Sequence, residues 1–163
     1  MLVNNLRAEL IKSFVGNFKS IEVDFKKQIK NGLGFFPYGT GLLQEGQSKI
    51  PLNCILILGK EFGSTEYFDR IKNNGEKSEP TIKNLLKVID TDLVDKVFLS
   101  NVFMGLIKDG KNLDVNREIK NPNYNNLCKE FLEYQINSIN PLLIVTLGNI
   151  PNEFFKTRPG IRE

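Results

Sequence analysis

Ile50-Pro-Leu-Asn-Cys-Ile-Leu-Ile-Leu58, followed by Gly59, is the stretch of sequence that decides the fold. The run is short and apolar and does not alternate with polar residues, which is typical of a strand buried on both faces of a parallel sheet. Lys60-Glu-Phe-Gly-Ser64 follows it directly. A loop with a carboxylate between two glycines therefore begins where the strand ends, and we expect its backbone to approach a ligand closely.

Amphipathic helices alternate with strands along the rest of the chain. Apolar spacing predicts helices over residues 3–19, 78–89, 127–139 and 151–156. The first continues through Ile21, Phe25 and Ile29, which gives a helical N-terminal extension over about residues 1–30. Residues 96–102 and 142–147 are predicted to be two further buried strands. This order predicts one α/β domain over residues 1–163, a three-layer α/β/α sandwich around a parallel sheet of three strands.

Two segments are predicted to be loops. Residues 31–49 contain Gly-Leu-Gly-Phe-Phe-Pro-Tyr-Gly-Thr-Gly, and residues 109–126 are polar and rich in asparagine. The first is not a phosphate-binding loop, because no Lys-Ser/Thr pair and helix follow its glycines. Its aromatic residues either line a pocket or pack at the surface. Thr81 is predicted to cap the helix of residues 78–89, whose buried face carries Ile82, Leu85, Leu86 and Ile89.

Composition excludes several kinds of site. The chain has 163 residues, a net charge of +3 and no histidine, which rules out a histidine triad, a histidine zinc site and a histidine general base. Its two cysteines form no metal-spaced pair, so we expect no metal or cofactor and a reduced, cytoplasmic setting. The N-terminus lacks the pattern of a signal peptide, and the apolar run of residues 141–147 is too short to span a membrane.

Three groups converge at the predicted carboxyl edge of the sheet. They are the loop 59–64, Asn101 at the end of the second strand, and Leu147-Gly148 at the end of the third. Ligands of such sheets bind at this edge, and the Asn101 amide can read the edge of a pyrimidine because it both donates and accepts. Each group also has a purely structural interpretation. Glu61 can cap a following helix, Asn101 can satisfy nearby backbone groups, and Gly148 can simply end a strand.

The sequence resembles the uracil-DNA glycosylase superfamily over about residues 35–150. The resemblance lies in the order and spacing of several segments: Ile55-Leu-Ile-Leu-Gly-Lys-Glu-Phe-Gly-Ser64, Glu79-Pro-Thr-Ile-Lys-Asn-Leu-Leu86, Val97-Phe-Leu-Ser-Asn-Val-Phe-Met-Gly-Leu106, Cys128-Lys-Glu-Phe-Leu and Asn140-Pro-Leu-Leu-Ile-Val-Thr-Leu-Gly148. In that family an acidic or amide residue follows the first strand, and an Asn that contacts the base ends a later strand.

The resemblance implies excision of uracil or a related damaged base from DNA, in base excision repair. The family flips a nucleotide out of the stack and hydrolyses the bond between base and sugar. By position, Glu61 would orient the water and stabilise the charged sugar, and Asn101 would bind the base. The backbone around Lys60 and Gly63 would assist, Phe62 would flank the base, and Gly59, Ser64 and Gly148 would shape the loops.

Two departures from the family pattern bear on this interpretation. The position of Glu61 often holds Asp or Asn in the family, so the carboxylate here is one methylene further out. The family also has a fourth strand and a His-Pro-Ser-like loop, which this sequence lacks. Without that fourth strand, residues 142–147 would form an exposed apolar edge. We therefore expect either that the chain is a truncated or frameshifted version of a longer protein, or that another element covers this edge. The N-terminal segment and a dimer partner are the two candidates for covering that edge.

Three functional hypotheses follow. The first is a DNA glycosylase with Glu61 and Asn101 at its centre. The second is a catalytically impaired relative that binds nucleic acid or a nucleobase without hydrolysis. The third is an unrelated doubly wound domain that binds a free nucleotide, which the absence of a Gly-x-Gly-x-x-Gly or Walker loop disfavours. The sequence does not indicate the oligomeric state.

Overall fold

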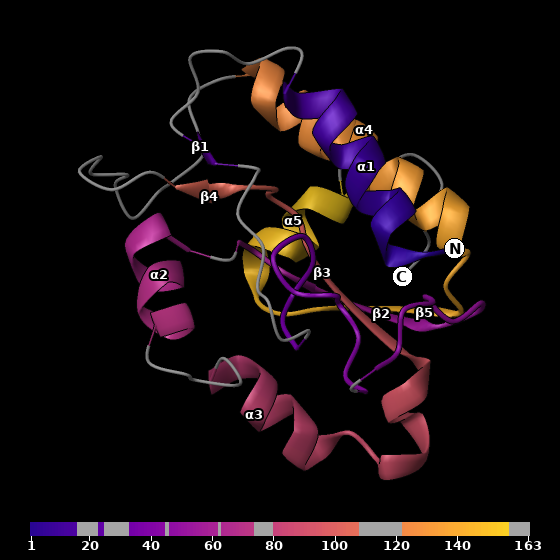
Figure 1. The fold of residues 1–163 in the computed structure, drawn as a ribbon. Coiled ribbons are helices and arrows are strands. Elements are labelled where there is room, and N and C mark those ends of the chain that lie inside the picture. Colours follow the sequence, from indigo (N-terminus) through magenta and orange to yellow (C-terminus); the bar gives the residue numbers. More distant parts are fainter. Residues whose placement is uncertain are drawn as a thin grey trace.

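The computed structural model describes residues 1–15, 23–24, 33–44, 46–61, 63–73, 80–107 and 122–156. The order of its elements is shown in Figure 1. The helices are α1 (Val3–Val15), α2 (Thr65–Asn73), α3 (Pro80–Val88), α4 (Pro122–Ile139) and α5 (Asn149–Lys156), with a 3-10 helix η1 (Thr91–Lys96). The strands are β1 (Val23–Asp24), β2 (Ile55–Gly59), β3 (Val97–Asn101), β4 (Leu106–Ile107) and β5 (Leu143–Thr146).

The main sheet has three parallel strands in the order β3-β2-β5. Gly59 pairs with Asn101 and Leu58 pairs with Thr146, so all three strands end at the same edge. The α/β fold with a parallel sheet of three strands is therefore confirmed. A separate antiparallel pair joins β1 to β4.

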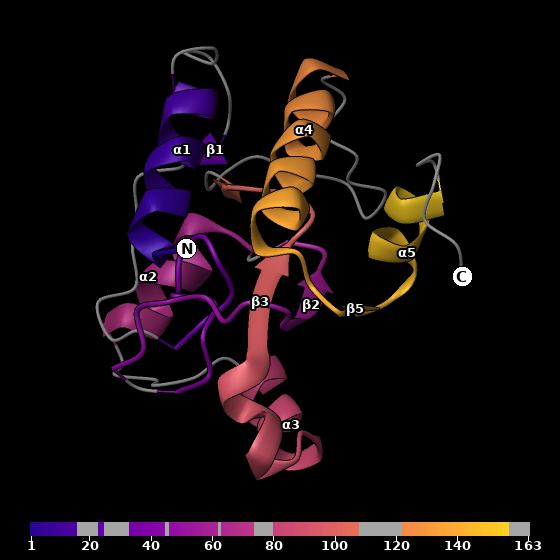
Figure 2. The ribbon, with the colours of Figure 1, turned by 90° about the vertical axis from the view of Figure 1, so that its right-hand side faces the viewer.

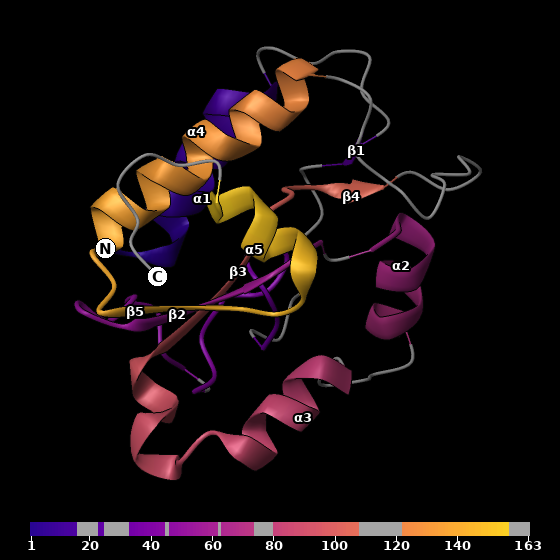
Figure 3. The ribbon, with the colours of Figure 1, turned by 180° about the vertical axis from the view of Figure 1, so that it is seen from behind.

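Helices lie on both faces of this sheet. In Figures 1 and 3, α1 and α4 run side by side above the sheet and α3 lies below it. The strand side chains divide accordingly, because successive residues point to opposite faces. Leu56, Leu58 and Phe98 pack with residues of α1 and α4 in one core, and Ile57 and Leu99 pack with residues of α2 and α3 in the other.

The glycine-rich loop, residues 33–44, lines the outer edge of β3 (Figure 2). Phe36 and Leu42 form bridges with Ser100 and Phe98, and the Phe36 amide donates to the Leu99 carbonyl at 3.0 Å. The loop reaches the strand this closely because Gly41 has a φ of +74° and a Cβ there would lie 2.3 Å from the Phe98 ring. The segment predicted to be a loop is thus irregular, but it is packed as part of the sheet.

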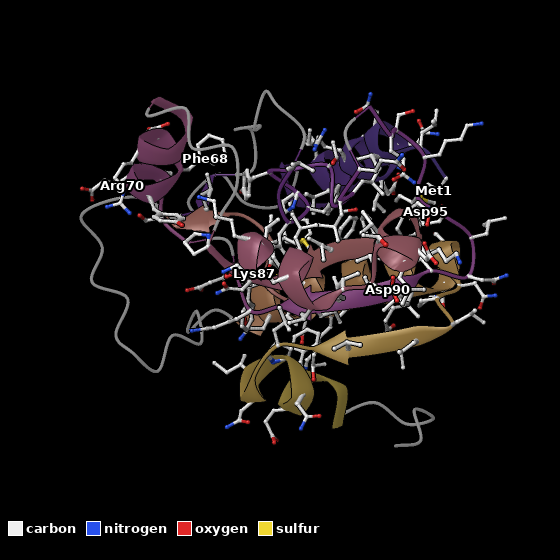
Figure 4. The ribbon with its side chains drawn as sticks, turned by 90° about the horizontal axis from the view of Figure 1, so that it is seen from below. Met1, Phe68, Arg70, Lys87, Asp90 and Asp95 are labelled. Atoms are coloured by element: carbon white, nitrogen blue, oxygen red, sulfur yellow. The ribbon has the colours of Figure 1, made fainter. Side chains whose placement is uncertain are left out.

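Strand β5 forms the other edge of the described sheet. Leu142 is 79% exposed and Leu143 is 53% exposed, as expected if no further strand pairs here. Figure 4 shows η1 and α3 lying across the sheet while β5 runs clear of them. The predicted apolar edge is therefore present among the described residues. The N-terminal segment does not cover it in the described range, because α1 packs against α4.

Several element boundaries differ from those predicted. Residues 23–24 form strand β1 instead of continuing the N-terminal helix, and the strand predicted from residue 50 begins at Ile55 because Pro51 and the positive φ of Asn53 interrupt it. Helix α4 begins at Pro122, within the stretch predicted to be a loop; residues 108–121 lie outside the described range.

Other differences concern α3 and three elements that were not predicted. Thr81 lies inside the first turn of α3 and does not cap it, because Pro80, with its fixed φ, already starts the helix. Leu86, predicted on the buried face, is 39% exposed. Helix α2, the 3-10 helix η1 and strand β4 were not predicted. No helix in the described ranges is long and apolar enough to cross a membrane.

Candidate functional site

Backbone hydrogen bonds tie the ends of the three parallel strands together. The amides of Val102 and Phe103 donate to the carbonyls of Gly59 and Lys60, each at 2.9 Å. On the other side, the Leu147 amide donates to the Leu58 carbonyl at 2.8 Å. The loop that carries Glu61 is therefore held between the continuations of β3 and β5.

A small pocket opens at this edge. Its volume is about 170 Å³, and residues from all three strand ends line it together with Phe35 and Thr81. The full lining is Phe35, Gly59, Lys60, Glu61, Thr81, Asn101 and Leu147. The space is smaller than the roughly 300–1,000 Å³ of drug-sized ligand sites, so it suits a single small ring better than a whole nucleotide.

Asn101 is the most deeply buried polar residue of the pocket, with 2% of its surface exposed. Its Nδ2 atom donates to the Phe36 carbonyl at 3.5 Å, the long limit of a hydrogen bond. Its Oδ1 atom lies over Gly59, 2.6 Å from where a Cβ of that residue would stand. Asn101 thus satisfies a backbone group, as one interpretation expected, and it also places an acceptor at the pocket. Gly59 is required because any larger residue would displace this amide.

Glu61 and Lys60 supply the charges of the pocket. Their side chains are 21% and 26% exposed, and Lys60 Nζ lies 3.9 Å from Glu61 Oε1. Glu61 also affects a buried neighbour. Burial is the largest cause that raises the pKa of Tyr124, the interaction with Cys128 raises it as well, and the negative charge of Glu61 adds to the shift. Glu61 is therefore a partly buried carboxylate at the strand end.

Ser64, and not Glu61, caps helix α2. The Ser64 hydroxyl accepts a hydrogen bond from the Tyr67 amide at 3.1 Å, which is the N-cap arrangement. The capping interpretation of Glu61 is thus not supported, and its carboxylate lines the pocket instead.

Phe35 forms the aromatic wall of the pocket. It is 3% exposed, and its ring lies 3.3 Å from where a Cβ of Gly59 would stand. Site prediction did not single out this residue, although the aromatic and glycine-rich composition of residues 31–49 was the signal for it. The predicted flanking residue, Phe62, lies outside the described residues. Thr81, predicted only as a cap, lines the pocket from the first turn of α3.

The other predicted loop residues lie away from the pocket lining. Gly63 and Gly148 have φ values of +111° and +91°, which explains why glycine stands at these two turns. Leu147, next to Gly148, is the residue that contributes to the lining. Within the described ranges, no group of three or more Cys, Asp or Glu side chains is placed to hold a metal ion.

Comparisons of the whole chain with known proteins give no relative: no family model, curated protein or solved structure matches it. The chemistry of the pocket therefore rests on its own residues. An amide, a carboxylate, an ammonium group and an aromatic ring face a space of about 170 Å³. That set can hold a flat heterocycle by hydrogen bonds at its edge and by contact with the Phe35 ring.

Proposed function

We propose that this pocket binds a pyrimidine base, uracil or a damaged relative, flipped out of DNA, and that the protein hydrolyses its N-glycosidic bond. The observation that carries the proposal is the position of Asn101. Its buried amide lies over Gly59, beside Glu61 and Phe35, at the carboxyl edge of a parallel sheet.

Recognition of the base would depend on Asn101 and Phe35. Because Nδ2 is directed to the Phe36 carbonyl, Oδ1 is the atom available to accept an N–H from the edge of a base. Uracil offers such an N–H between its two carbonyls, and its single ring suits the size of the pocket. The Phe35 ring offers an apolar wall to the base, since aromatic contact stabilises unstacked bases by about 1–3 kcal/mol.

Glu61 would act at the sugar. As the bond between the base nitrogen and C1′ breaks, its electron pair passes to the base and positive charge develops on the sugar. The carboxylate stabilises that charge and takes a proton from the water whose oxygen bonds to C1′. The base departs as an anion whose negative charge is shared by its carbonyl oxygens, and it then takes up a proton from solvent. Backbone amides around Lys60 and Gly63 would donate hydrogen bonds to those oxygens.

Oligonucleotide cleavage tests this proposal. The protein is incubated with single- and double-stranded DNA containing one uracil, and alkali then breaks the strand at each abasic site. We expect cleavage only at uracil, with Glu61→Gln slowing it by about 100-fold or more and Asn101→Ala by a similar factor. Glu130→Gln and Asn84→Ala, which change exposed residues of α4 and α3, are the matched controls. Equal rates in Glu61→Gln and the native protein would refute the assigned role.

The second hypothesis, binding without hydrolysis, is favoured by one feature of the sequence. The chain has no histidine, so the histidine that contacts the base in the resembled family has no counterpart here. Salt-sensitive binding of uracil-containing strands without abasic sites, abolished by Asn101→Ala, would establish this alternative. A reduced cytoplasmic setting fits both hypotheses, because Cys54 and Cys128 are buried free thiols.

A further inference from the structure

Arg7, on helix α1, contacts the loop that forms the aromatic wall of the pocket. Its Nε atom donates to the Pro37 carbonyl at 3.1 Å, and its Nη2 atom donates to the Gly39 carbonyl at 2.9 Å. The guanidinium carbon also lies 5.9 Å from the centre of the Phe36 ring. One side chain therefore contacts three residues of the loop, Phe36, Pro37 and Gly39.

The helix that carries Arg7 is a firm support. Leu6 and Leu10 on α1 are fully buried, and Phe14 packs edge-to-face on Tyr124 and Phe131 of α4, with ring centres 6.2 and 6.1 Å apart. The beginning of the chain is anchored as well, because the Val3 amide donates to the Ser48 carbonyl at 3.1 Å.

The held segment leads directly to the pocket. The Gly39 amide donates to the Phe35 carbonyl at 2.9 Å, which closes a turn over residues 35–39. Phe35, the first residue of this turn, forms the pocket wall, and the Phe36 carbonyl accepts a hydrogen bond from Asn101 Nδ2. A shift of the turn would therefore move both the ring and the amide that face the ligand.

Arginine is the residue that this position needs. The carbonyls of Pro37 and Gly39, two residues apart, match the planar pair of N–H donors that a guanidinium presents. The single ammonium of lysine presents no such pair. Hydrogen bonds from a charged donor are also stronger than neutral ones. Burial lowers the pKa of Arg7, and within the described residues its charge has no carboxylate partner. The guanidinium is thus directed to the loop carbonyls.

We propose that Arg7 is a positioning residue: it holds the turn of residues 35–39 so that Phe35 and Asn101 face the ligand in a fixed geometry. The segment that resembles a known family does not include Arg7, so this contribution of the N-terminal helix comes from the contacts alone. The inference rests on the proposed function only for the identity of the ligand.

Amide hydrogen exchange tests the holding role without any ligand. In Arg7→Met, we expect the Gly39 and Gly41 amides to exchange about tenfold faster or more, while the Leu56 and Ile57 amides in the central strand β2 change little. Lys12→Met, which changes an exposed cation of the same helix, is the matched control and should leave all four unchanged. Unchanged exchange at Gly39 and Gly41 in Arg7→Met would overturn the proposal.

Chemical rescue separates a local role from general destabilisation. If Arg7→Met loosens the whole chain, Arg7→Ala is measured with and without millimolar guanidinium, with sodium chloride as the ionic control. Slower exchange at Gly39 and Gly41 with guanidinium supports the proposal, and the absence of any rescue overturns it.

Uracil binding then tests the link to the pocket. We expect the Kd for uracil to rise about tenfold in Arg7→Met and to stay unchanged in Lys12→Met. A native protein that binds no uracil would refute the proposed function, while the exchange data would still decide the role of Arg7. Native-like uracil binding by an Arg7→Met protein with a loosened turn would overturn the positioning role.

Discussion

The two edges of the parallel sheet differ sharply. Along β3, the loop 33–44 closes the edge with bridges to Phe98 and Ser100, and its aromatic residues are almost fully buried. Along β5, apolar side chains such as Leu142 and Leu143 stay exposed. The closed edge is also the one that carries Asn101 and the wall of the pocket. The better-packed edge of the sheet is therefore the one that carries the candidate ligand site.

This difference has a physical cause in the sequence of each flanking segment. The loop beside β3 contains glycines that allow the backbone to approach the strand, with Gly41 as the clearest case. In the described residues, nothing comparable flanks β5, whose four residues pair only with β2. Edge strands of this kind, without charged residues, are prone to pair with other chains. Substitutions at matched positions can measure how unequal the two edges are.

The largest difference is expected for truncation of one apolar side chain at each edge. Phe36 is fully buried and stacks on Phe131, with ring centres 6.2 Å apart, so Phe36→Ala should lower the free energy of unfolding by about 3–5 kcal/mol. Leu143 is 53% exposed, so Leu143→Ala should cost less than about 1 kcal/mol. Urea unfolding measures both. Losses of the same size would show that the β5 edge is as well packed as the other.

A smaller difference is expected for a methyl group added at each edge. A Cβ on Gly41 would lie 2.3 Å from the Phe98 ring at a φ of +74°, so Gly41→Ala should cost about 2–4 kcal/mol. Gly148 has a φ of +91° but no heavy atom within 4 Å of its Cβ position, so Gly148→Ala should cost only about 1 kcal/mol of backbone strain. Thermal unfolding compares the two variants. A larger loss at Gly148 would reverse the comparison.

The smallest difference is expected in thiol reactivity. Burial raises the pKa of Cys54 to about 11 and that of Cys128 to about 12. The carbonyl of Cys54 accepts from Leu142, next to the open edge, whereas Tyr124 and Met104 adjoin Cys128. We therefore expect Cys54 to react with a thiol reagent about tenfold faster than Cys128, because more of it is thiolate at a given pH. Mass spectrometry of partly labelled protein measures the ratio.

The pH of that labelling follows from the same pKa values. Both thiols have folded-state pKa values above the ordinary 9.0, so their contribution to stability is complete below pH 9 and is lost as the pH rises toward 11 and 12. Labelling at pH 8 therefore leaves the fold intact. Faster labelling of Cys128 than of Cys54 under these conditions would contradict the prediction that the thiol near the open β5 edge is the more reactive one.

Much of the fold could be predicted from sequence because its signals are local. The strands around Leu56, Leu99 and Ile144 follow from apolar runs, and their alternation with helices gives the parallel order, although the strand around Ile144 is not buried as predicted. The predicted N-terminal helix is wrong at residues 23–24, which form strand β1 and pair with β4. Such pairing depends on a partner far along the chain, which periodicity does not reveal.

The candidate site shows the same division. Gly59, Glu61 and Asn101 were found because strand ends of a parallel sheet converge. Phe35 and Arg7 were not singled out, because their roles depend on how the loop 33–44 folds against β3 and α1. The composition of that loop indicates an aromatic, glycine-rich segment, but contacts between residues 30 or more positions apart decide which ring faces the pocket.

The most direct test of the central claim is the side-chain amide signal of Asn101 in an NMR spectrum. Its Nδ2 protons are identified by their loss in Asn101→Asp. We expect the signal to shift as uracil is added and to stay in place when ribose 5-phosphate is added, because the pocket accepts a base and not a sugar phosphate. An Asn101 signal that does not move with saturating uracil, or that moves with ribose 5-phosphate alone, would contradict the account.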